Sequence, residues 1–113
     1  MGYDLHITRA QVDWDDDQHP INAEEWLNLV ANDDTLKVFE NDNDEYILTD
    51  WTPAEEPHQG HYFTWDHGRI SAKYPPKSAF VKMLQLAELL GGRVLGDDGE
   101  LYQAADDYNP LAR

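Results

Sequence analysis

Histidines are the first side chains in this sequence that could support chemistry. His58 and His61 are separated by two residues, and His67 follows soon after. Zinc sites use histidines at short spacing together with carboxylates. If His61 begins a strand and His67 lies in the turn that ends it, their imidazoles sit at opposite ends of that strand. We therefore expect ordinary surface histidines, with no metal site and no other cofactor.

Hydroxyl and carboxylate groups give no assembled catalytic motif either. Ser71 falls within a predicted strand and Ser78 at the start of a predicted helix, and the chain has no G-x-S-x-G elbow or glycine-rich phosphate loop. The runs Asp15–Asp17 and Asp42–Asp44 lack the glycine and the flanking helices of a calcium loop. Because the chain holds 23 Asp and Glu, some carboxylates will lie close together in any fold. We expect a protein that is not an enzyme.

Net charge is the most informative property of the composition. The formal net charge is −15, and residues 1–56 hold sixteen acids but only Arg9 and Lys37 as bases. A field of this sign repels nucleic acid and anionic membranes, and it speeds the encounter with a basic partner. The simpler interpretation is solubility, since acidic side chains suit a surface. We expect a basic protein partner and no direct binding of nucleic acid.

Two tryptophans suggest where such a partner would bind. Trp14 lies within the Asp13–Asp17 run, and Trp51 ends a predicted strand beside a proline-containing loop. Aromatic anchors surrounded by charge are typical of interfaces, although either ring could instead fold over the edge of the sheet. Trp26 and Trp65 are predicted core residues. The predicted contact surface comprises Asp13, Trp14, Asp15, Asp16, Asp17, Asp33, Asp34, Asp42, Asp44, Glu45 and Trp51.

Length and composition favour one cytoplasmic domain. The chain has 113 residues, 41% of them hydrophobic, which is enough for one modest core. The sequence has no cysteine, no secretory signal at its start and no apolar run near the roughly 20 residues of a membrane helix. We expect one domain over residues 1–113, with a loosely held tail from about residue 106, and no membrane association.

The elements of the first half follow from hydrophobic periodicity. Alternation from Tyr3 to Thr8 predicts a half-buried strand. Asn22 with Glu25 is a variant capping box, and Ile21 can pack on Trp26, so a helix is expected to start at Asn22 and to end near 32–34. A short strand at 36–39 precedes an acidic turn at 41–44.

The second half is predicted from residue 45 onward. Strands are expected at 45–51, 61–66 and 69–73, the last two forming a hairpin in which Gly68 takes a positive φ. An amphipathic helix runs from Lys77 or Ser78 to Leu90 and stops at Gly91. Val94 and Leu95 begin a last strand, to which 101–102 returns. The expected order is β-α-β-β-β-α-β(β), an α+β fold with two helices on a mostly antiparallel sheet.

Segments along most of the chain resemble a family of small acidic bacterial proteins. The similarity lies in the start YDLHITR, the Glu25–Trp26 pair, the Met83–Leu90 helix and the segment GDDGELY at 96–102. That largely uncharacterised family is similar to immunity proteins of bacterial polymorphic toxin systems, and it implies no catalytic residues. The resemblance implies an inhibitor that neutralises a toxin by direct contact. The alternatives are a nucleic-acid mimic that blocks a DNA-binding protein and an uncharacterised small-molecule binder.

Overall fold

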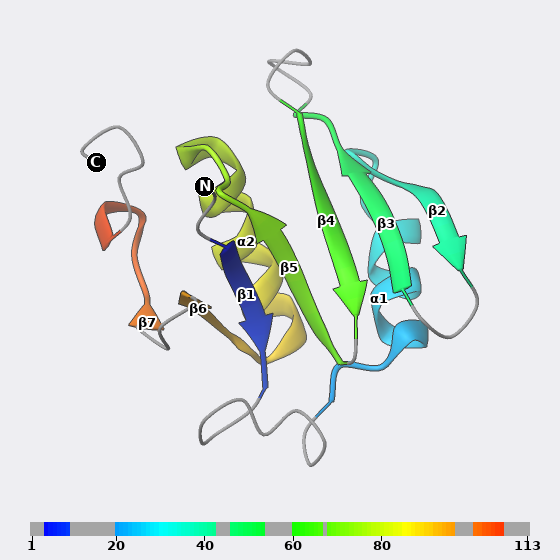
Figure 1. Ribbon diagram of the computed structural model, residues 1–113, viewed down its shortest axis with the longest axis horizontal. Helices are drawn as coiled ribbons and strands as arrows, with labels where there is room; N and C mark the ends of the chain where they lie inside the picture. The colour runs from blue at the N-terminus through cyan, green and yellow to red at the C-terminus, as the bar shows by residue number, and fades with distance from the viewer. Residues whose placement is uncertain are drawn as a thin grey trace.

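The computed structural model describes residues 4–9, 20–42, 46–53, 60–66, 68–96 and 101–107. Over these ranges the chain forms seven strands and two α-helices (Figure 1). In chain order they are β1 (Asp4–Thr8), α1 (Ala23–Ala31), β2 (Leu36–Asp42), β3 (Tyr46–Trp51), β4 (His61–Asp66), β5 (Arg69–Lys73), α2 (Lys77–Leu90), β6 (Arg93–Gly96) and β7 (Leu101–Tyr102), followed by a 3-10 turn at Ala105–Asp107.

The strands form a single antiparallel sheet in the order β2-β3-β4-β5-β1-β6-β7. Strands β2 to β5 make a meander, and β1 lies between β5 and β6. The α+β class and the two helices on an antiparallel sheet are therefore confirmed. Four strands separate the helices in the described chain, matching the strands predicted near 36–39, 45–51, 61–66 and 69–73, although the predicted order counted only three there.

Both helices cover the same face of the sheet. Seen from the opposite side, α1 and α2 lie behind the strands (Figure 1). Alternate strand residues point toward the helices, and these side chains, with the apolar faces of α1 and α2, make one buried cluster. Trp26 and Trp65 belong to it, as predicted, and Trp26 Nε1 donates to Thr49 Oγ1 at 3.0 Å within the core.

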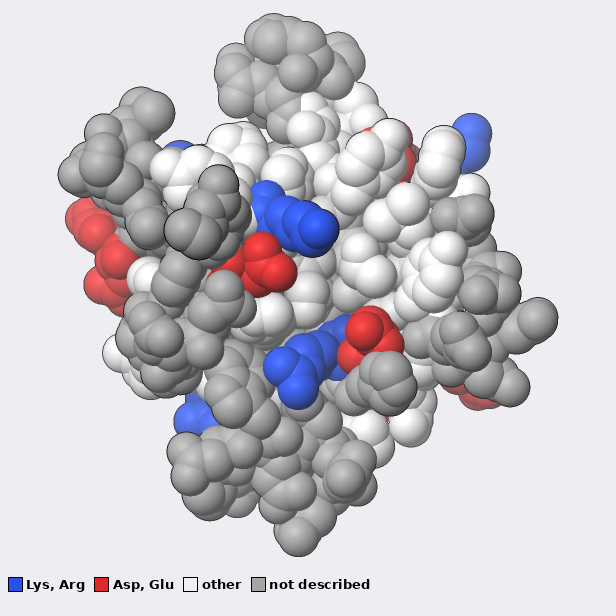
Figure 2. Space-filling model, viewed as in Figure 1, with Lys and Arg blue, Asp and Glu red and all other residues white. Residues whose placement is uncertain are grey.

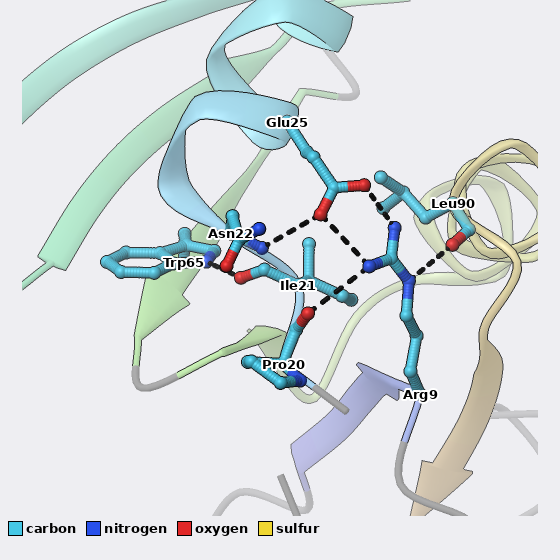
Figure 3. A network of polar contacts seen from close by, with 7 residues as sticks. All are labelled: Arg9, Pro20, Ile21, Asn22, Glu25, Trp65 and Leu90. Atoms are coloured by element: carbon cyan, nitrogen blue, oxygen red, sulfur yellow. Dashed lines mark hydrogen bonds and ion pairs between the residues drawn. The ribbon is translucent and has the colours of Figure 1, made fainter. Parts of the chain in front are cut away.

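The start of α1 is fixed by a polar network at the bottom of the core (Figure 3). The Asn22 N–H donates to Glu25 Oε1 at 3.2 Å, and the Asn22 side chain accepts from the Glu25 N–H, so both arms of the predicted capping box are present. The indole of Trp65 donates to the Ile21 carbonyl at 2.7 Å, so the residue before the cap is tied to β4. Ile21 and Trp26 are both fully buried, consistent with the predicted packing across the helix start.

Arg9, directly after β1, completes this network. Its guanidinium forms a bidentate pair with Glu25, with Nη1 at 2.9 Å from Oε1 and Nη2 at 2.5 Å from Oε2. It also donates to the carbonyls of Leu90 at 2.7 Å and Pro20 at 3.2 Å. Arg9 thus joins the end of β1, the start of α1 and the end of α2. The hydrogen bonds from Arg9 and from the Asn22 N–H lower the pKa of Glu25.

Glycines end two elements as the sequence predicts. Asp66 pairs with Arg69 across the β4–β5 hairpin, and Gly68 has a φ of +84°. Gly91 ends α2 with a φ of +69°. Both backbones lie in the left-handed region, which glycine enters without a Cβ penalty.

The predicted acidic turn at 41–44 is wrong in its first half. Asn41 and Asp42 continue β2, paired with Ile47 and Tyr46. The register shifts between Val38 and Glu40, a β-bulge that places one extra residue in β2. Pairing to β3 therefore outweighs the turn preference of Asn and Asp.

Near the C-terminus the Asp107 carboxylate accepts the N–H groups of Gln103 and Ala104, and the rest of the predicted tail lies outside the described residues.

Candidate functional site: the helix-free face of the sheet

The face of the sheet opposite the helices carries the second set of alternating side chains. Their positions follow from the strand register, which aligns residues of neighbouring strands in rows across the sheet. The central row is Leu48, Thr64, Ser71, His6 and Leu95. No described helix packs on this side, where Leu48, Thr64, Ser71 and His6 are half-buried and Leu95 is buried.

This face contains a hollow of about 730 Å³. That volume is within the range of small-molecule sites, roughly 300–1,000 Å³. The hollow spans strands β1, β3, β4 and β5, and its walls combine apolar, hydroxyl, imidazole and charged side chains. Its lining residues are Asp4, His6, Leu48, His61, Tyr62, Thr64, Asp66, Arg69, Ser71 and Lys73.

A hydrogen bond between His6 and Ser71 lies at the centre of the hollow. His6 Nδ1 and Ser71 Oγ are 2.7 Å apart, joining β1 to β5. Such a pair could in principle activate a hydroxyl, but Ser71 lies in the middle of an interior strand. Its backbone groups belong to the sheet ladder and so offer no oxyanion site. The arrangement suits hydrogen bonding to a bound group better than nucleophilic attack.

Charged residues lie on either side of this central row. Asp66 is the register partner of Arg69 at one end, and Asp4 is the register partner of Lys73 at the other. Figure 2, which looks onto this face, shows two groups of basic side chains, each beside an acidic one, separated by uncharged residues. The four charges that line the hollow sum to zero, on a chain whose formal net charge is −15.

His61 lies at the rim of the hollow and is held by β5. Its Nε2 is 3.0 Å from the Lys73 carbonyl oxygen. Burial lowers the pKa of His61, and the hydrogen bond to Lys73 only partly opposes that effect. The imidazole is therefore neutral over more of the physiological pH range than an ordinary histidine.

An exposed aromatic pair lies on the same face, and one of its members, Tyr62, also lines the hollow. Phe39, at the β2 bulge, is 66% exposed and Tyr62 of β4 is 49% exposed. Their ring centroids are 5.8 Å apart, so Phe39 reaches across β3 to Tyr62. Two large aromatic rings left in solvent together are typical of the anchors in protein interfaces.

Two of the predicted contact residues follow α1, and they differ in exposure. Asp34 is exposed and available to a partner. Asp33 pairs instead with Lys82 of α2, with Nζ and Oδ2 2.5 Å apart, and Asp33 Oδ1 accepts hydrogen bonds from the N–H and hydroxyl of Thr35. Burial raises the pKa of Asp33, but the hydrogen bonds from Lys82 and Thr35 outweigh it, and the pKa lies below its usual value. Asp33 thus ties the loop after α1 to α2.

The structure does not support Trp51 as an exposed anchor. Its side chain is only 6% exposed and belongs to the core, where its ring packs near Phe63 at a centroid distance of 6.1 Å. Trp51 has the same strand parity as Ile47 and Thr49, which face the helices, so the alternation of β3 places it inside.

The remaining predicted contact residues have side chains outside the described part of the chain. Asp13, Trp14, Asp15, Asp16, Asp17, Asp44 and Glu45 lie outside the described residues, and of Asp42 only the backbone is described, within β2. His58 and His67 also lie outside them, and the described residues contain no cluster of three metal-ligating side chains. Neither α1 nor α2 is long and apolar enough to cross a membrane.

Comparison with models of protein families, with curated proteins and with solved structures finds no match for this chain. The description of the site therefore rests on the positions and contacts of its own residues.

Sequence reasoning missed the hollow because its residues come from distant segments. His6 and Ser71 are 65 positions apart, and only the insertion of β1 beside β5 brings them together. One signal was present in the sequence: the polar positions of the predicted strands at 3–8, 61–66 and 69–73 hold the same residue types that line the hollow. Strand order, which decides whether they meet, was not predictable.

Proposed function

We propose that this is a non-catalytic binding protein of the inhibitor or immunity type, which acts in the cytoplasm by direct contact with a basic protein such as a toxin. The observation that carries the proposal is the exposed Phe39–Tyr62 pair on the uncovered face of the sheet. The formal net charge of −15 supports it, because a field of that sign speeds the approach of a basic partner.

The two features contribute to different rates. Aromatic anchors that become buried in the complex slow dissociation, whereas charges around them mainly raise the association rate. In this proposal Phe39 and Tyr62 form the centre of the contact. Asp34 and the Asp13–Asp17 run contribute to the negative net charge that attracts the partner.

The first experiment is co-expression with the product of the neighbouring gene, followed by kinetic binding measurements with that product. The variant Phe39→Ala/Tyr62→Ala is expected to bind at least about 30-fold more weakly, mainly through faster dissociation. The matched control is Val81→Ala/Leu89→Ala, which removes two exposed apolar side chains of α2 instead. Its affinity should stay within about twofold of wild type.

A second variant tests the charge. Asp15→Asn/Asp16→Asn/Asp17→Asn should lower the association rate at low salt about tenfold and weaken its salt dependence. The proposal is wrong if the neighbouring product binds the Phe39→Ala/Tyr62→Ala variant as tightly as it binds wild type, or if no basic partner is bound. Salt-labile capture of several unrelated DNA-binding proteins would instead support a nucleic-acid mimic.

A further inference from the structure

The hollow on the helix-free face has a charge pattern that selects a ligand class. Arg69 and Lys73 lie four residues apart on β5, a separation of about 13 Å along a strand. Each has an acidic register partner, Asp66 and Asp4 respectively. Both ends of the hollow therefore offer a cation and an anion, and its total formal charge is zero.

A ligand that pairs with the cation of one end and the anion of the other carries charges of both signs, separated by most of that length. An anion alone would face Asp4 and Asp66, and a cation alone would face Arg69 and Lys73. An extended peptide of three or four residues has an ammonium and a carboxylate roughly 10–13 Å apart. Its charge and length match the hollow.

The middle of the hollow suits the middle of such a peptide. The hydroxyls of Thr64 and Ser71 and the imidazole of His6 form a row between the charged ends, and peptide N–H and C=O groups need such partners when they leave water. Leu48 and Tyr62 on one side give an apolar wall for a side chain. The His6–Ser71 hydrogen bond fixes two of these groups before a ligand arrives.

From this geometry we infer that the hollow between β1, β3, β4 and β5 binds short zwitterionic peptides of three or four residues. The peptide lies along β5, with its carboxylate at Arg69 or Lys73 and its ammonium at the aspartate of the opposite end. Asp4, Asp66 and Arg69 already interact within the protein, so peptide groups compete with those contacts. A dissociation constant in the range of about 10 μM to 1 mM is expected.

The test is an NMR titration of the full chain with trialanine, monitoring the amides of β1 and β5 and the His6 ring. Trialanine should give saturable shifts at these positions. Its N-acetylated, C-amidated form, which lacks both charges, should bind at least about tenfold more weakly. Dialanine is too short to reach both ends and should also bind more weakly.

Variants separate the hollow from the rest of the surface. Arg69→Gln/Lys73→Gln should weaken trialanine binding at least about tenfold, whereas Lys37→Gln/Lys77→Gln, which removes two bases outside the hollow lining, should leave it within about twofold. A thermal melt of each variant checks that it is folded.

Three results would overturn the inference. They are the absence of saturable shifts up to about 20 mM peptide, equal binding of the capped and free peptides, and full binding by Arg69→Gln/Lys73→Gln. The inference does not rest on an inhibitor function. The peptide titration uses free peptides, so its result does not depend on whether a protein partner is found. If no peptide binds, the Phe39–Tyr62 test of the inhibitor proposal is unaffected.

Discussion

Arg9 is a single residue on which three elements depend, since its side chain contacts Glu25 at the start of α1, Leu90 at the end of α2 and Pro20. Replacing it with Met keeps most of the stem but removes every one of these hydrogen bonds. We expect Arg9→Met to lower the free energy of unfolding by about 1–3 kcal/mol, measured by urea denaturation. Lys37→Met, an exposed base on β2, should change it by less than about 0.5 kcal/mol.

Glu25 sets the pH dependence of the difference in unfolding free energy between wild type and Arg9→Met. The folded pKa of Glu25 is lowered, so its pairing with Arg9 stabilises the protein fully above the unfolded pKa of about 4.3. The contribution is lost as the pH falls through the lowered folded pKa. The difference in stability between wild type and Arg9→Met should therefore become smaller on acidification, while the part due to the Leu90 and Pro20 carbonyls remains. An equal difference at pH 7 and at pH 2–3 would show that Arg9 acts through those carbonyls and packing, without a contribution from Glu25.

At the scale of elements, the two glycines with a left-handed backbone have different surroundings: Gly68 lies in a crowded turn, and Gly91 lies at an open helix end. A Cβ on Gly68 would lie 2.9 Å from the Cβ of Pro20, in the segment that leads into α1. A Cβ on Gly91 would meet nothing within 4 Å. Both substitutions incur the cost of a left-handed alanine, about 1–2 kcal/mol, and Gly68→Ala adds a steric clash with the segment that leads into α1.

We therefore expect Gly68→Ala to destabilise the protein by at least about 1 kcal/mol more than Gly91→Ala in urea denaturation. Hydrogen exchange should show the extra loss at the hairpin and at Ile21, whose N–H donates to the Gly68 carbonyl at 2.9 Å. Equal losses for the two variants would mean that Pro20 moves away without cost.

At the scale of the whole molecule, net charge opposes compactness. A formal charge of −15 on 113 residues makes the folded state repel itself more than the expanded unfolded chain does. Raising NaCl from about 10 to 150 mM shortens the screening length to roughly 8 Å and should raise the urea midpoint. If the midpoint instead fell with salt, attractive pairs such as Arg9–Glu25 and Lys82–Asp33 would outweigh the self-repulsion.

The sequence by itself determined the elements, because these depend on local patterns. Alternation defined the strands, the capping box at Asn22 and Glu25 started α1, and Gly68 and Gly91 ended their elements where the chain needs a positive φ. It also determined the charge and the α+β class. The wrongly predicted element boundaries were places where two local preferences compete. At Asn41 and Asp42, pairing with β3 outweighed the turn preference of these residues.

Only the tertiary structure decided which of these elements are neighbours. Placing β1 between β5 and β6 joined His6 to Ser71 and aligned Asp4 with Lys73, although those pairs are far apart in sequence. The parity of β3 turned Trp51 inward, and the β2 bulge accompanies the exposed Phe39 beside Tyr62. Strand order and register are set by burying a shared core between one face of the sheet and two helices. That is a property of the whole chain, so no local pattern could have predicted the hollow on the other face.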